Sequence, residues 1–397
     1  MVLIGNAFCP GHIDGFFSIH DQTDHMMRTG IRGAGMNLSL GVMVMNTLKT
    51  PEDTGSRDPL KVDIDASGVE EFLVDEDIYR MVLEYLLPGK GSGWESNLRV
   101  RIQLPVSQGF SMSSAGILAT SISVWEALYS KMPSWDRKLR FRAQQERFFS
   151  MKKNEMKLRP IKKRYSSKPR ITDSKKASGH DIAVPVRASG MMNWGGIVKT
   201  PSDMLKNSRA SDDVGLISYA DCIYAAHRID IMTGGGIGDI VALARGGITM
   251  RLSPGVPPFG EIHTIPSGVD KPPRIVLVIL GDPLDRITML TNPLRRNTIN
   301  KIGAGCLKDL LLAPSINRFV SESRKFADGS GFMNYKIKRA LSEIDDISPG
   351  SMVMLGNSAF SLVTTAEDSE EIIRERWMDH GTVFSMDLDL HGARPLN

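Results

Sequence analysis

Cysteine is scarce in this chain of 397 residues, which contains Cys9, Cys222 and Cys306 and no CxxC pair. The scarcity excludes a disulfide framework and a thiolate zinc cluster, and it is typical of a protein in the reducing cytoplasm. Long apolar runs are also missing, since no stretch of about 18 apolar residues occurs that could cross a membrane. No basic segment precedes the short apolar run at the start. We therefore expect a cytoplasmic protein without a secretory signal or a membrane partner.

Disorder of the whole chain is excluded by its ordinary composition, with 41% hydrophobic and 24% charged residues. The net charge is only +4, but residues 131–209 contain 21 Lys and Arg against 6 Asp and Glu. Such a segment indicates an anionic partner or a solvated arm. We predict an N-terminal domain over 1–130 and a basic insertion over 131–212. The rest of the core and a C-terminal domain follow over 213–397.

Strands and helices are predicted to mix without a regular βαβ repeat, which favours an α+β architecture. Residues 98–104 alternate apolar and polar side chains, as a half-buried strand does, and 115–129 have helical spacing. A further helix is expected over 217–232. The apolar run 275–280 suits a buried strand. Residues 352–363 predict a hairpin or two strands around a Gly-Asn turn.

A loop of small and polar residues, from Pro105 to Ala115, joins the first predicted strand to the first predicted helix. Small residues let an anion approach the backbone closely. Unpaired N–H groups at the start of a helix, together with the helix dipole, then form an anion site. An ordinary N-capped helix is the commoner explanation of such a loop. The sequence Gly-x-x-x-x-Gly-Lys-Ser/Thr is absent, which excludes a Walker loop.

Two further segments are candidates for chemistry. Four glycines within five positions, from Gly234 to Gly238, precede Asp239. Ordering so many glycines is costly, so a ligand or unusual dihedral angles would have to require them. Asp239 is placed to orient a hydroxyl group or accept its proton, although a flexible turn with a capping Asp explains the pattern equally well. Near the N-terminus, a turn with aromatic residues surrounds His12, which alone is more often a structural histidine than a catalyst.

Together and in this order, the three segments resemble the GHMP kinase superfamily, named for galactokinase, homoserine kinase, mevalonate kinase and phosphomevalonate kinase. The phosphate loop of that family has the form Pro-x-x-x-Gly-Leu-Gly-Ser-Ser-Ala, to which Pro105 to Ala115 is similar. The family's catalytic Asp precedes a Gly-Gly pair by seven residues, and Asp239 precedes Gly246 by that interval. A third family motif is loosely matched by 349–358.

Within the superfamily, the chain resembles the archaeal pantoate kinase branch in residues 10–17, 32–38, 226–228 and 254–258. Three residues depart from the family pattern, and the basic insertion is absent from the ordinary pantoate kinases. Ser111 replaces a glycine of the phosphate loop, which would distort it. Asp14 replaces a Thr or a small residue. Asp230 replaces a Glu that helps to hold Mg²⁺.

The resemblance implies a GHMP kinase fold with a ribosomal-protein-like N-terminal half and a ferredoxin-like C-terminal half, and an enzyme that often forms homodimers. It implies transfer of the γ-phosphoryl group of ATP to an alcohol, with Asp239 as the catalytic residue. Mg²⁺ would be held by Ser113 and Asp230. The implied ATP-binding residues are Pro105, Gly109, Phe110, Ser111, Met112, Ser113, Ser114 and Ala115.

The acceptor is expected to contact His12, Asp14 and Arg32. The Arg32 guanidinium is suited to grip a carboxylate, although a surface salt bridge explains this residue as well. Mevalonate 3-phosphate, in archaeal isoprenoid synthesis, is the lead substrate, because the basic insertion supplies cations for its additional phosphate. Pantoate, in coenzyme A synthesis, is the alternative. Nucleic-acid binding is a remote hypothesis, because the basic segment has few aromatic residues to stack on bases.

Overall fold

The computed structural model describes residues 2–23, 25–68, 75–151, 217–234, 236, 238–266, 272–284, 290, 292–363 and 367–396. Most of the predicted basic insertion, from residue 152 onward, lies outside the described residues, as do Gly235 and Ile237 of the glycine segment. Within the described part of the chain, no helix has the length and the apolar character needed to cross a membrane.

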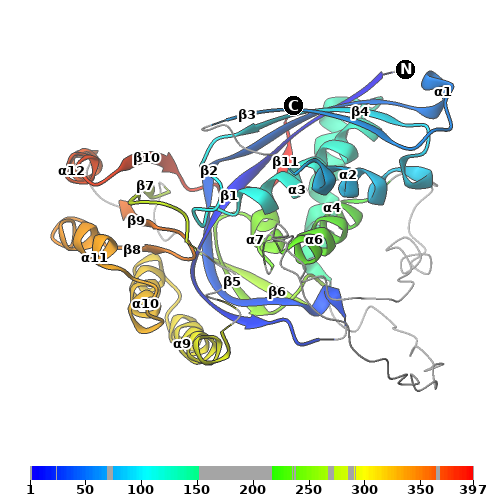
Figure 1. Ribbon diagram of the computed structural model, residues 1–397. Helices are drawn as coiled ribbons and strands as arrows, with labels where there is room; N and C mark the ends of the chain where they lie inside the picture. Colours follow the sequence, from blue (N-terminus) through cyan, green and yellow to red (C-terminus); the bar gives the residue numbers. More distant parts are fainter. Residues whose placement is uncertain are drawn as a thin grey trace, which may run out of the picture.

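A seven-stranded sheet forms the first half of the molecule (Figure 1). Its centre is a long antiparallel hairpin of β1 (Val2–His20) and β2 (Gly30–Lys49), with bulges after Pro10 and Asp14. One part of the hairpin pairs with β4 (Glu95–Ile102), which pairs in parallel with β3 (Lys61–Gly68). Further along, β2 pairs with β5 (Ile248–Ser253), which continues to β6 (Glu261–Ile265). The short β11 (Arg394–Pro395) adds to the outer side of β1.

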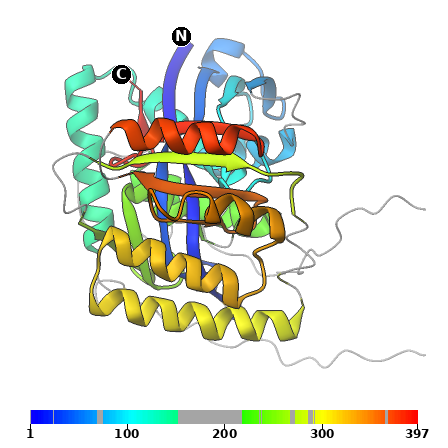
Figure 2. The same ribbon diagram turned by 90° about the vertical axis from the view of Figure 1, so that its left-hand side faces the viewer.

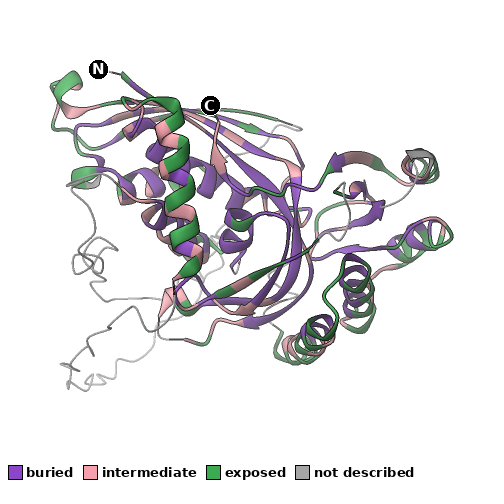
Figure 3. Ribbon diagram, turned by 180° about the vertical axis from the view of Figure 1, so that it is seen from behind, coloured by how far each residue is buried: buried purple, intermediate pink, exposed green. Residues whose placement is uncertain are grey.

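Helix α3 (Met112–Leu128) is the core of this half, because it is buried along almost its whole length and apolar on all sides. It packs on β1 and β2 and is covered by α2 (Glu76–Leu86) and α6 (Tyr219–Thr233). Helix α4 (Ser134–Ser150) packs on α6, and its outer face is exposed (Figure 3). The short α7 (Ile240–Arg245) lies with α6 inside the curve of the hairpin (Figure 1).

The second half is built on a four-stranded antiparallel sheet in the order β10-β7-β9-β8. Its strands are β7 (Arg274–Ile279), β8 (Gly350–Val353), β9 (Ser358–Val363) and β10 (Thr382–Asp387). Its helices are α9 (Pro293–Leu312), α10 (Ile316–Gly329), α11 (Tyr335–Ser342) and α12 (Glu367–Met378). Figure 2 shows α12 on one side of these strands and α9 and α10 on the other. Because α9 and α10 also pack on β1, they join the two halves.

The α+β architecture predicted from the sequence is confirmed, and the five predicted elements exist with bounds shifted by a few residues. The first strand and helix are β4 and α3, and the helix over 217–232 is α6. The apolar run is β7, and the predicted hairpin is formed by β8 and β9. Local periodicity therefore located these elements, while their bounds depend on packing.

Two glycines of α9 allow a test of how this helix docks on β1. A Cβ on Gly303 would collide with the carbonyl oxygen of Phe17, whereas a Cβ on Gly305 would meet nothing within 4 Å. Helix propensity alone favours Ala over Gly by about 1 kcal/mol at either position. We expect Gly305→Ala to raise the thermal unfolding midpoint and Gly303→Ala to lower it, by overpacking of about 1–3 kcal/mol. Equal stabilisation by both changes would contradict the close contact.

Candidate active site

The first backbone N–H groups of α3 have no partner within the helix. The N–H of Ala115 donates to the carbonyl oxygen of Ser111 at 2.9 Å, which is the first hydrogen bond of the helix. The N–H groups of Met112, Ser113 and Ser114 precede it and have no intrahelical partner, as in any helix. The sequence predicts an anion site at these groups, and the structure differs from that prediction in one respect. Ala115 was expected to contribute, but its N–H is already engaged within the helix.

The loop before α3 holds an unusual backbone. Ser107, Gly109 and Ser111 have φ values of 63°, 82° and 55°. For a residue with a Cβ, the left-handed region costs about 1–2 kcal/mol. The sequence predicts that Ser111 distorts the loop. In the structure, Ser111 adopts a left-handed backbone conformation that glycine enters freely, so its effect is local backbone strain. Its Oγ donates a hydrogen bond of 2.7 Å to Oδ2 of Asp239.

Gln108 clamps the phosphate loop to the second half of the molecule. Its Nε2 donates to the carbonyl oxygen of Gly281 at 2.9 Å, and its Oε1 accepts from the N–H of Asn357 at 3.2 Å. A Cβ on Gly109 would lie 2.5 Å from the carbonyl oxygen of Met354, so the turn between β8 and β9 touches the loop. Pro105 begins the loop, and Phe110 is buried beneath it. The loosely matched family motif at 349–358 is thus in contact with the loop from Pro105 to Ala115.

Three side-chain oxygens converge on Gly236. A Cβ at this position would lie 2.8 Å from Oδ2 of Asp230, 2.9 Å from Oγ of Ser114 and 3.2 Å from Oδ2 of Asp239. These oxygens come from α6, α3 and the N-cap of α7. Ser114 Oγ also donates to Oδ1 of Asp230 at 2.7 Å. This crowding, rather than flexibility, explains why a glycine stands here.

The converging oxygens have the chemistry that Mg²⁺ prefers, namely hard donors with one or two carboxylates and room for phosphate oxygens. Among the described residues, no group of three or more His, Cys, Asp and Glu side chains is arranged to hold a metal ion by itself. The residues therefore fit a metal that is shared with a bound phosphate. Ser114 donates to Asp230, whereas the family resemblance assigns the metal contact to Ser113, and that assignment stays a prediction. Ser113 is partly exposed at the start of α3.

Arg251 of β5 occupies the centre of the site, although sequence reasoning missed it. It is 1% exposed and donates to Oδ1 of Asp14. Its Nη1 lies 3.3 Å from Nε2 of His12 and 3.8 Å from Oδ1 of Asp239. A Cβ on Gly35 would collide with Nε2 of His12, so glycine in β2 leaves space for the ring beside the guanidinium. One guanidinium is thereby shared between the buried carboxylate of Asp239 and the partly buried carboxylate of Asp14.

The orientation of His12 is set by Asn37 of β2. Asn37 Nδ2 donates to the carbonyl oxygen of Ala242 at 3.0 Å, which directs Oδ1 to His12 Nδ1 at 2.7 Å. Nδ1 must therefore carry a proton, while Nε2 lies between Nη1 of Arg251 at 3.3 Å and Oδ1 of Asp14 at 3.4 Å. His12 is completely buried. It contacts Arg251 in this conformation, and the contact with the acceptor that the sequence predicts stays a prediction.

The two carboxylates differ in their titration. Burial raises the pKa of Asp239, and the charge of Asp14 raises it further, against the opposing effects of His12, Arg251 and Ser111. Burial also acts to raise the pKa of Asp14, but Arg251 and His12 together outweigh it, and the pKa of Asp14 falls below its ordinary value. Asp14 thus remains ionised and holds Arg251, while Asp239 is the stronger base of the pair.

Arg32, the predicted carboxylate partner, lies on β2 near His20. Burial lowers the pKa of His20, and the charges of Arg32 and Arg296 lower it further. Nε of Arg32 is buried and makes no hydrogen bond within the described part of the chain. A Cβ on Gly238 would lie 3.2 Å from Cα of Gly30, so the segment before Asp239 borders this end of β2. Arg32 is therefore near the site but outside the Asp14–Arg251 cluster.

Residues 389–393 near the C-terminus pack against the end of α7 and the Gly-Gly pair that follows it. The N–H of Gly247 donates to the carbonyl oxygen of Asp389 at 2.7 Å, and the N–H of Ala393 donates to that of Leu243 at 2.9 Å. A Cβ on Gly246 would lie 2.5 Å from the backbone N of Gly392. The Gly-Gly pair that follows Asp239 therefore allows the C-terminal segment to pack against the end of α7.

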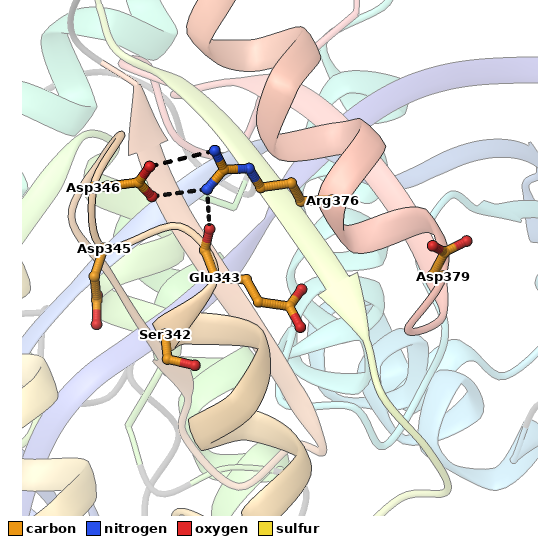
Figure 4. A pocket seen from close by; sticks show the side chains of 6 residues that line it. All are labelled: Ser342, Glu343, Asp345, Asp346, Arg376 and Asp379. Atoms are coloured by element: carbon orange, nitrogen blue, oxygen red, sulfur yellow. Dashed lines mark hydrogen bonds and ion pairs between the residues drawn. The ribbon is translucent and has the colours of Figure 1, made fainter.

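A surface hollow lies apart from these residues, between α11 and α12. It has a volume of about 760 Å³ and is lined by Ser342, Glu343, Asp345, Asp346, Arg376 and Asp379. Figure 4 shows Arg376 bound to Asp346 and to the carbonyl oxygen of Glu343. Neither Asp239 nor the phosphate loop contributes to its lining, and its acidic character opposes binding of a phosphate. This hollow is therefore not a candidate for the predicted phosphate site.

The known proteins to which this chain is similar in sequence and that are described here are all pantoate kinases. No family model matches the chain. The pantoate kinase of Methanocaldococcus jannaschii is 32% identical over 151 residues, which are 38% of this chain and 54% of that protein. For the pantoate kinase of Thermococcus kodakarensis the identity is 28%, over 36% and 46% of the two chains. The matches thus span about half the length of these two relatives. The pantoate kinase of Methanospirillum hungatei is 24% identical over 91% of this chain and 88% of that protein.

Solved structures align with nearly the whole chain. A phosphotransferase related to the coenzyme A biosynthesis pathway has a TM-score of 0.64 at 20% identity, covering 100% of this chain and 99% of its own. Homoserine kinase from Cytophaga hutchinsonii has a TM-score of 0.54 at 11% identity, covering 99% and 97%. Mevalonate diphosphate decarboxylase from Staphylococcus aureus has a TM-score of 0.54 at 10% identity, covering 100% and 99%. At these identities the likeness shows a shared fold, which by itself does not determine the activity.

Proposed function

We propose that this chain, a member of the GHMP kinase superfamily with the fold that the sequence predicted, transfers the γ-phosphoryl group of ATP to a hydroxyl group of pantoate. The observation that carries the proposal is the convergence of two features. The N–H groups at the start of α3 form an anion site, and Asp239 is joined to the same loop through Ser111 at 2.7 Å. An acidic group beside a phosphate site is the arrangement that phosphoryl transfer to an alcohol requires.

The start of α3 would bind the phosphates. The N–H groups of Met112, Ser113 and Ser114 donate to phosphate oxygens, and the positive end of the helix dipole favours their charge. Asp230 and Ser114 would hold Mg²⁺, with Ser113 as a further hydroxyl at the same end of the helix. Magnesium, when bound, supplies positive charge that neutralises the phosphate oxygens. Gly109 lets this loop adopt its positive φ against the β8–β9 turn.

Asp239 would orient the acceptor hydroxyl and accept its proton. Its raised pKa makes it a better base than an exposed carboxylate, because a base works best when its pKa approaches the operating pH. Arg251 keeps the carboxylate in place from the opposite side, at 3.8 Å. In a loose transition state, such positioning and charge neutralisation supply most of the rate.

Pantoate is favoured over mevalonate 3-phosphate, the lead substrate from the sequence, because the three curated relatives are pantoate kinases. The argument for mevalonate 3-phosphate rested on the basic insertion, which lies largely outside the described residues. Arg32 would hold the acceptor's carboxylate, since its buried Nε lacks a hydrogen bond in the described structure. A guanidinium pairs with a carboxylate through two parallel hydrogen bonds.

The substrate is tested by measuring ATP consumption with pantoate, mevalonate, mevalonate 3-phosphate and mevalonate 5-phosphate side by side. We expect kcat/KM for pantoate to exceed that for each of the others by at least about 100-fold, because a polar site rejects acceptors that leave its groups unpaired. A preference for mevalonate 3-phosphate would overturn pantoate as the acceptor and retain the kinase. Absence of ADP formation with all acceptors would contradict both.

A further inference from the structure

Ser111 connects the phosphate loop to Asp239, and nothing in the family resemblance accounts for its hydroxyl, because the family has a glycine there. Ser111 is the N-cap residue of α3. A serine at an N-cap ordinarily accepts a hydrogen bond from an N–H of the first turn. Ser111 makes no such bond. Its hydroxyl instead donates to Oδ2 of Asp239 at 2.7 Å.

The backbone of Ser111 explains this choice. With φ 55° and ψ 32°, it lies in the left-handed region, whereas capping serines adopt extended dihedral angles. The left-handed conformation turns the side chain away from its own helix and toward α7. The N–H groups of the first turn therefore stay available to an anion, while the hydroxyl is directed to a carboxylate from another element.

We propose that Ser111 is a positioning residue with two linked effects: its left-handed backbone leaves the first-turn N–H groups of α3 open to phosphate, and its hydroxyl fixes Asp239 in the orientation that receives the acceptor. The second effect rests on the proposed function. The hydrogen bond itself does not, so it can be tested in the protein without ATP or acceptor.

The groups around Asp239 have opposing effects on its ionised form, and the hydrogen bond from Ser111 favours that form. From β1, Asp14 adds negative charge next to it, and Oδ2 of Asp230 on α6 approaches the same point at Gly236. From β5, Arg251 opposes this at 3.8 Å, with His12 beside it. Burial raises the pKa of Asp239 most, and the hydrogen bond from Ser111 is among the contacts that lower it. Loss of the hydroxyl therefore shifts the pKa upward.

Two variants separate the hydroxyl from the backbone. Ser111→Ala removes the hydroxyl and keeps the strained Cβ, whereas Ser111→Gly removes both the hydroxyl and the strain. If only the backbone mattered, both variants would keep wild-type turnover, because Ala retains the strained Cβ of the wild type and Gly adopts the left-handed conformation freely. If the hydroxyl matters, both variants lose the bond to Asp239, and the Gly variant is the more stable of the two. Since Gly adopts this conformation freely, that variant is the one expected to fold in any case.

The first measurement is the pKa of Asp239 in the ligand-free protein, from carboxyl ¹³C NMR of protein labelled at Asp. The Asp239 signal is assigned by its loss in Asp239→Asn. We expect the pKa to rise in both Ser111 variants. An unchanged pKa in Ser111→Gly would overturn the inference, whether or not the protein is a kinase.

The second measurement is the pH profile of kcat with ATP and pantoate. Because Asp239 acts in its ionised form, a higher pKa moves the acidic limb of the profile to higher pH. We expect this shift in both variants, with kcat lowered roughly tenfold and KM for ATP little changed. Ser111→Asn, which tolerates the left-handed region and carries an N–H donor, should recover part of the loss. A wild-type profile in Ser111→Gly would contradict the positioning role while leaving the kinase intact.

Discussion

Asp239→Asn is expected to lower the turnover of pantoate phosphorylation by about 10²- to 10⁴-fold and to leave nucleotide binding nearly unchanged. The amide cannot accept the hydroxyl proton, although it retains the shape of the carboxylate. The phosphate-binding N–H groups belong to α3, so their geometry does not depend on the charge of Asp239. Steady-state rates and the affinity for a fluorescent ATP analogue measure the two effects separately. Full turnover in this variant would remove Asp239 from the chemistry.

The same substitution should also stabilise the protein. The raised pKa of Asp239 means that folding disfavours its ionised form, so a neutral amide removes a penalty at neutral pH. A matched control is Asp221→Asn in α6, where Asp221 Oδ2 accepts from the N–H and hydroxyl of Ser218. We expect the control to keep wild-type turnover and to lose about 1 kcal/mol through its weakened helix cap. The two Asp→Asn changes thus act in opposite directions on stability, and only Asp239→Asn lowers the rate.

Arg251→Met is expected to destabilise the protein by about 3–5 kcal/mol, because it leaves Asp14 and Asp239 buried without their shared cation. Asp14 is ionised at neutral pH while Arg251 is present, since Arg251 and His12 hold its pKa below the ordinary value of 3.8. Without Arg251, burial dominates and raises the pKa of Asp14. Chemical unfolding at neutral pH measures the loss. A variant as stable as the wild type would contradict a central role for this ion pair.

The pH dependence of this loss follows from the signs of the shifts. In the wild type the lowered pKa of Asp14 contributes stability above pH 3.8, and this contribution disappears as pH falls through the folded-state pKa. In Arg251→Met the sign reverses, so the variant gains stability as Asp14 becomes protonated. The difference between the two proteins should therefore shrink in acid. The double variant Asp14→Asn/Arg251→Met should be more stable at neutral pH than Arg251→Met alone, which measures the coupling.

Arg251 shows what the sequence could not provide. A single Arg in the short apolar segment after Gly246-Gly247 resembles any edge-strand cation, and no motif marks it. Its role arises from the register that places it opposite Gly33 of β2, and from the glycine at 35 that makes room for His12. Register depends on long-range pairing, which the local pattern does not encode. A lone charge within an apolar strand was the one available signal.

The serines of the phosphate loop show that a sequence motif can locate a loop without fixing the contacts of each side chain in it. The motif located the loop and the helix that follows it, and both predictions are confirmed in the structure. It assigned the metal contact to Ser113, whereas Ser114 donates to Asp230. Successive helical residues point about 100° apart, so a shift of one position changes which side chain faces α6. The left-handed conformation of Ser111, which sets where the helix starts, cannot be seen in residue spacing.

The account's central claim is that the start of α3 and Asp239 together form a phosphoryl-transfer site. A crystal structure with a non-hydrolysable ATP analogue and Mg²⁺ tests it most directly. We predict the phosphates on the N–H groups of Met112 to Ser114, the metal between Ser114 and Asp230, and the carboxylate of Asp239 facing the γ-phosphate. A nucleotide bound elsewhere, or Asp239 turned away from the phosphates, would contradict the account.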